Sequence, residues 1–157
     1  MTGTVRWWRA RLETGADDGS AVIEFLGITL ILLVPTVYLV LVLGRIQAGT
    51  FAAESAAAQA ARAVVVGGDY ATGVTAAVAS VRVALADQGF DGDDAESALA
   101  VSCASVPCLA PGSTVATRVD VDVPLPFVPG FVRDVVPLSV RVSAEHVAAV
   151  DQYGGVG

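Results

Sequence analysis

The stretch from Gly19 to Leu43 reads GSAVIEFLGITLILLVPTVYLVLVL, and it decides how the rest of the chain is arranged. From Phe25 onward this stretch has no charged residue. A helix rises about 1.5 Å per residue, so this run is long enough to cross the roughly 30 Å hydrocarbon core of a bilayer. We therefore expect a membrane-spanning helix. Glu24 stands at its entrance, and an ionisable side chain there is a candidate functional residue.

The residues before this stretch indicate its orientation. Residues 1–19 are polar and carry Arg6, Arg9 and Arg11, whereas Arg45 is the next arginine after the apolar run. Positive side chains collect on the cytoplasmic side of a membrane helix. We expect a single-pass protein of the cell membrane, with a cytoplasmic N-terminus and an extracytoplasmic C-terminal part. A cleaved secretory signal is the weaker interpretation, because the apolar run exceeds the usual ~7–15 residues and the helical pattern continues past it.

The apolar run continues into an alanine-rich segment with strong helix propensity. One helix is therefore predicted over residues 20–66, ended by Gly67 and Gly68. The many alanines of residues 52–63 predict a smooth face on which a neighbouring helix packs closely, although alanine also fills exposed helix positions by propensity alone. Within the apolar run, Pro35 predicts a kink, and the hydroxyl of Thr36 is available for the carbonyl that the proline frees.

Residues 69–150 predict a small extracytoplasmic domain of the α+β class. A second helix is expected from Asp69 to Gln88, with Asp69 or Thr72 as its N-cap and Gly89 as its stop. Residues 115–123 and 136–145 alternate apolar and polar side chains, which predicts two strands. We expect them to pair antiparallel in a short sheet with one apolar face on the helices. A third strand is expected within residues 98–103. The proline-rich residues 124–130 predict an irregular connection, and residues 151–157 a flexible tail.

Two polar features of this domain were considered as ligand sites. Cys103 and Cys108 are the only cysteines, and outside the cytoplasm such a pair favours a disulfide over a metal site or a redox pair. The acidic residues 91–96 have oxygen ligands that suit calcium, but their spacing does not fit the known twelve-residue calcium loop. A solvated turn in which Asp93 or Asp94 caps a short helix is the favoured interpretation.

The composition argues against several classes of function. The chain has a net charge of −7 and no lysine, so it lacks the concentrated basic face that nucleic-acid binding needs. No phosphate-binding loop, nucleophile elbow or metal-ligand cluster is present in the sequence, and we expect neither a catalytic residue nor a cofactor nor a metal. His146 is the single histidine and is expected at a strand end, where it is structural or exposed. An enzyme is the disfavoured class.

At the start of the apolar run, Gly19 is followed by Ser20, with Glu24 as the fifth residue after the glycine and then Phe25. This pattern resembles the processing site of type IV prepilins. The basic leader, the long helix and the later helix and paired strands, joined through residues 124–131, resemble the TadE-like pseudopilins of tight-adherence (Tad/Flp) pili.

This resemblance implies that a membrane prepilin peptidase cleaves the chain after Gly19 and leaves Ser20 as the new N-terminus. It implies that Glu24, followed by Phe25, serves substrate recognition and assembly with other pilin-like subunits and the pilus assembly platform. A carboxylate and an ammonium in lipid are each costly alone and much less costly together, which is a reason for such a pairing. Ser20 departs from the aromatic residue of classical pilins at this position. The implied product is a minor pseudopilin or assembly subunit of a surface pilus; the alternative is an unprocessed, membrane-anchored binding module.

Overall fold

The computed structural model describes residues 4–90, 94–128 and 138–153. In chain order the elements are α1 (Thr4–Val66), α2 (Tyr70–Asp87), α3 (Ala95–Ala98), β1 (Leu99–Cys103), β2 (Thr114–Pro124) and β3 (Ser139–Ala149). The fold is α+β, as predicted. The chain divides into two compact units, residues 1–41 and 42–157, and each is described by itself.

The long helix α1 is one continuous helix across Pro35. It begins at Thr4, whereas the sequence predicted a start at residue 20, so most of the leader is helical as well. The hydroxyl of Thr36 donates to the carbonyl of Leu32 at 2.7 Å. The carbonyl that Pro35 deprives of its amide partner is that of Ile31, so Thr36 bonds to the next carbonyl along the helix.

The helix α2 is bounded as its sequence predicted. Asp69 is the N-cap, and its carboxylate accepts a hydrogen bond from the amide of Thr72 at 3.0 Å, which lowers the pKa of Asp69. Gly68 and Gly89 both have positive φ angles, 78° and 75°, a conformation that favours glycine. These two glycines therefore allow the chain to leave α1 and α2.

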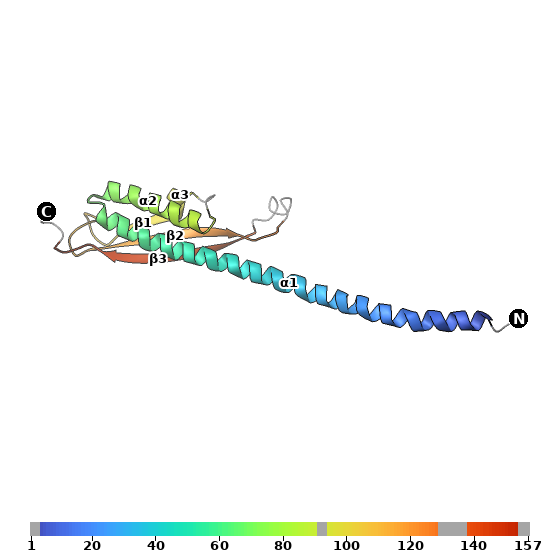
Figure 1. Ribbon diagram of the computed structural model, residues 1–157. Helices are drawn as coiled ribbons and strands as arrows, with labels where there is room; N and C mark the ends of the chain where they lie inside the picture. Colours follow the sequence, from blue (N-terminus) through green and yellow to red (C-terminus); the bar gives the residue numbers. More distant parts are fainter. Residues whose placement is uncertain (1–3, 91–93, 129–137, 154–157) are drawn as a thin grey trace. The chain divides into compact units, whose positions relative to one another are not determined.

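The three strands form one antiparallel sheet in the order β1-β2-β3. Val119 of β2 lies opposite Leu99 of β1 and opposite Ala144 of β3. In Figure 1 the helix α2 and the adjoining part of α1 lie on one side of this sheet. Every second residue of β2 is fully buried against the helices: Val115, Thr117, Val119, Val121 and Val123. The predicted alternation of β2 and the third strand are confirmed.

The strand β3 differs from its prediction at its C-terminal end. It was expected to end at Glu145 but continues to Ala149, so His146 lies inside the strand and not at its end. His146 is paired with Thr117 in the ladder. The cause is long-range, because the 11-residue β2 offers a hydrogen-bonding partner along its whole length. Residues 129–137, which include the start of the predicted strand, lie outside the described residues.

The alanine face of α1 is a packing face, and its partners are within the same domain. Seven residues of this face are buried to 1% exposure or less: Ala52, Ala53, Ala56, Ala57, Ala60, Ala61 and Val64. At Gly73 of α2, an added Cβ would lie 2.6 Å from the carbonyl oxygen and 2.9 Å from the Cα of Val64. Gly49 of α1 approaches the side chain of Val123 just as closely. Small residues thus allow α1, α2 and β2 to meet at short distance.

We predict that Gly73→Ala lowers the stability of the domain by about 1–3 kcal/mol, because the backbone of α1 must move to admit the methyl group. The matched control is Gly44→Ala on α1, where an added Cβ meets nothing within 4 Å. Alanine is the better helix former, so this control should be neutral or stabilising. Thermal unfolding of the detergent-solubilised chain, followed by circular dichroism, measures both; equal melting temperatures would contradict the close contact.

Thr117 is the buried polar residue of the core, and its hydroxyl donates to the carbonyl of Ala57 at 2.8 Å. We predict that Thr117→Val, which keeps the side-chain shape, lowers stability by about 1 kcal/mol through loss of this bond. Thr75→Val is the matched control, because the hydroxyl of Thr75 is exposed and bonds within its own helix to Ala71. Denaturant titration of both variants measures their free energies of unfolding. It tests whether the bond between sheet and helix contributes to stability and the bond within α2 does not.

Candidate functional site

The predicted processing and assembly residues all lie on α1. This helix contains Gly19, Ser20, Glu24 and Phe25, and it is unbroken between the leader and the apolar run. Ser20, Glu24 and Phe25 are exposed, and Phe25 is 67% exposed.

The apolar run of α1 is exposed along its whole length. From Val22 to Leu43 the large aliphatic and aromatic side chains are at least 40% exposed, except Val42, which is partly buried. Among the described residues, Ser20–Val66 contains the one helix long and apolar enough to span a membrane, with a mean hydropathy of 2.7 in its most apolar window. Nothing in the helix's own unit covers this surface. Transfer of so many apolar side chains out of water is strongly favourable.

The apolar run ends where the domain begins. The guanidinium of Arg45 lies 4.9 Å from the ring centroid of Phe90, which is buried beside the start of the core. This cation–π contact and the close approach of Gly49 to Val123 fix α1 to the domain. The alanine face that follows, from Ala52 to Val64, is already occupied by α2 and the sheet. Contacts with other subunits along this face are therefore excluded, although the sequence left them open.

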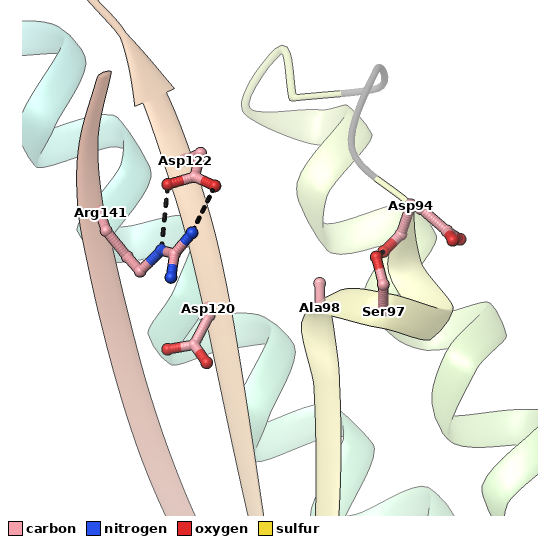
Figure 2. A pocket seen from close by; sticks show the side chains of 6 residues that line it. All are labelled: Asp94, Ser97, Ala98, Asp120, Asp122 and Arg141. Carbon is pink, nitrogen blue, oxygen red and sulfur yellow. Dashed lines mark hydrogen bonds and ion pairs between the residues drawn. The ribbon is translucent and has the colours of Figure 1, made fainter. Parts of the chain in front are cut away.

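A polar hollow lies between α3 and the face of the sheet that points away from α1 and α2 (Figure 2). It has a volume of about 250 Å³ and is lined by Asp94, Ser97, Ala98, Asp120, Asp122 and Arg141. Arg141 donates two hydrogen bonds to the carboxylate of Asp122, each 3.2 Å long. This pairing raises the pKa of Arg141. Asp94 caps α3, as predicted, while Asp91 and Asp93 of the possible calcium turn lie outside the described residues.

Asp120 forms the second polar group of this face. Its carboxylate accepts a hydrogen bond from the hydroxyl of Ser143 and one from Arg118 at 3.2 Å. The Ser143 bond is the largest cause that lowers the pKa of Asp120. The alternation of β2 predicted that Arg118, Asp120 and Asp122 share a face. Their partners Arg141 and Ser143 depend on the register of β3, which local sequence does not encode.

The remaining predicted site residues do not gather into a catalytic centre. His146 is exposed on β3, and Glu145 lies on the opposite face of the sheet. Within the part of the chain that the structure describes, no three His, Cys, Asp or Glu side chains could hold a metal ion. Cys103 and Cys108 lie at disulfide distance, with their Cα atoms 5.2 Å apart, as predicted. They close the loop that follows β1.

No family model matches this chain, and no curated protein or solved structure is similar to it.

We predict that the Asp120 pair stabilises the domain at neutral pH and loses this effect in acid. The pKa of Asp120 is lowered in the folded state, so its contribution is complete above the ordinary aspartate pKa of about 4 and disappears as pH falls through the lower folded pKa. In the wild type the melting temperature should fall between neutral pH and the acid range, and in Asp120→Asn it should fall by less. Ser143→Ala removes the main cause and should reproduce the effect; an unchanged pH profile in both variants would contradict it.

Proposed function

We propose that this chain is a minor pseudopilin or assembly subunit of a tight-adherence, type IV-like pilus. In this proposal α1 anchors the protein in the cell membrane, with the N-terminus in the cytoplasm and the domain outside. A prepilin peptidase cleaves after Gly19, and the mature protein joins other pilin-like subunits and the assembly platform through its N-terminal helix.

One observation carries the proposal: α1 is a single helix whose first part exposes an apolar surface all round and whose second part forms the core of the domain. Lipid and other membrane helices are the environments that suit such a surface. Because the alanine face is buried inside the domain, helix packing between subunits is left to the part of α1 before Arg45. The charge of Glu24 is then costly in lipid unless a partner supplies a cation or a hydrogen-bond donor.

The second candidate is an unprocessed, membrane-anchored module that binds a partner in the cell envelope. Its support is the polar sheet face, which carries the two carboxylate–arginine pairs on an open surface. This candidate needs the anchor but neither cleavage at Gly19 nor the carboxylate of Glu24.

We predict that substitution of Gly19 by a bulkier residue blocks processing. In cells that carry a prepilin peptidase, mass spectrometry should find Ser20 as the N-terminal residue of the wild-type chain and a precursor that retains residues 1–19 in Gly19→Val. Gly27→Val is the matched control in the same helix, at a site where an added Cβ meets no neighbour, and it should be processed normally.

Glu24→Gln separates the two candidates. The pilus proposal predicts that this isosteric change reduces processing or incorporation into subunit complexes, whereas the binding module tolerates it. An intact wild-type N-terminus in the presence of the peptidase would overturn the pilus proposal.

A further inference from the structure

The outer edge of β3 presents backbone groups for another strand. The amide of Leu125 donates to the carbonyl of Leu138 at 3.1 Å, and these two residues continue the register between β2 and β3. In an antiparallel ladder, the pairs that exchange backbone hydrogen bonds recur at every second residue from such a pair. The even-numbered residues of β3 therefore bond to β2, and the odd-numbered residues direct their N–H and C=O groups outward. No hydrogen bond to these outward groups occurs among the described residues, and β3 contains no proline. Such an edge is a template for strand addition.

Among the described residues, the opposite edge of the sheet also has no strand paired to its outer side. The amide of Ala104 donates to the carbonyl of Thr114 at 3.0 Å and continues the register between β1 and β2. By the same alternation, Leu99, Val101 and Cys103 direct their backbone groups away from β2. The 5-residue β1 is thus a second, shorter edge that a strand could extend.

The direction of α1 decides which strand can meet β3. Gly49 lies against Val123, and the carbonyl of Ala57 accepts the hydroxyl of Thr117, so α1 runs antiparallel to β2. It therefore runs parallel to both edge strands. In each copy the part of α1 within the domain begins at Val42, directly after the anchor. In copies anchored in one membrane, these parts of α1 therefore run in the same direction. Only a parallel strand of a second copy can then add to β3. Both edge strands meet this condition, but only β1 keeps the helices of both copies on the same face of the joined sheet.

An antiparallel, two-fold pairing of β3 with itself conflicts with this constraint. Antiparallel pairing about Ser143 would place Arg141 opposite Glu145 of the second copy, which is favourable in charge. It would also set the two α1 helices antiparallel, with their anchors at opposite ends. That arrangement does not suit two chains in one membrane.

The helix layer supports the parallel arrangement. Neighbouring helix axes lie 8–10 Å apart, whereas neighbouring strands lie about 4.8 Å apart. Because α2 packs beside α1 on the β1 side, it extends about one strand spacing beyond β1. A groove of about 320 Å³ follows this side of α2 and is lined by Val74, Thr75, Val78, Ala79, Arg82 and Glu96. The helix-facing side of β3 is in turn poorly covered, since Val140 is 37% exposed and His146 is exposed.

We propose that copies of this chain associate side by side by continuing the sheet, with β3 of one copy parallel to β1 of the next. The apolar residues on the helix-facing side of β3 then lie beneath α2 of the neighbour and occupy this groove. The contact joins two different surfaces, so it leaves one free edge at each end and can repeat along a row. The inference rests on the membrane anchoring in the proposed function, but it does not require cleavage at Gly19.

Cross-linking of full-length chains in membranes tests the arrangement. Ser102 of β1 and Val147 of β3 lie at the same level of the sheet, both opposite Ala116, and both are exposed. Two differently tagged chains, one with Ser102→Cys and one with Val147→Cys, are co-expressed and treated with a short bifunctional maleimide. A product that carries both tags is expected, and each variant alone should give none.

Proline at an outward amide gives a second test. Glu145→Pro removes one outward N–H and no bond to β2, and it should lower the yield of the doubly tagged product at least about fivefold. Glu145→Ala is the matched control with the amide retained and should leave the yield unchanged. The melting temperatures of both variants are measured as a control for folding of the domain.

The remaining outcomes overturn the inference. Cross-linking of Val147→Cys to itself indicates two-fold pairing, products with a different protein alone indicate another occupant, and no product indicates free edges. The Gly19→Val precursor is cross-linked in parallel. Normal cross-linking without processing refutes the proposed pilus function alone, and normal processing without cross-linking refutes the sheet contact alone.

Discussion

The close contact between α1 and the rest of the domain is the constraint on which the structure depends. A helix can approach another helix and a strand this closely only if its side chains are small, and the buried face of α1 consists of alanines between Gly49 and Val64. Gly73 allows the same approach from α2. Because these residues contribute little apolar surface each, the core depends on close packing against the larger side chains of α2 and the four buried valines of β2.

This contact divides α1 into two parts with different surroundings. After Arg45 one face of the helix is buried in the domain and the other is exposed and carries Glu54, Gln59 and Arg62. Before Arg45 the helix is apolar on all sides and is not covered within its own unit. Both proposed functions need this division, because the first part suits lipid or other membrane helices and the second part holds a folded domain. Helix packing with other subunits is consequently expected in the first part alone.

The sheet adds a second asymmetry. One face carries the valines that meet the helices, and the other carries the arginine and aspartate pairs, which hold β2 and β3 together across the open surface. Exposed ion pairs of this kind contribute little stability each. Their more specific effect is on register, since a slip of β3 by one residue would separate Arg141 from Asp122 and turn its apolar residues outward.

Local sequence determined much of this protein. The apolar run, the N-cap Asp69 and the stop at Gly89, the alternation of β2 and the cysteine pair are each encoded within a few residues, so their periodicity and spacing predicted them correctly. The tertiary structure decided what those elements meet. It showed that the alanine face packs inside the domain, that β3 continues past His146 because β2 offers partners there, and that Asp120 pairs with Ser143. These features depend on contacts between residues far apart in the chain, and local patterns carry no information about which distant groups complete a hydrogen bond or fill a packing face.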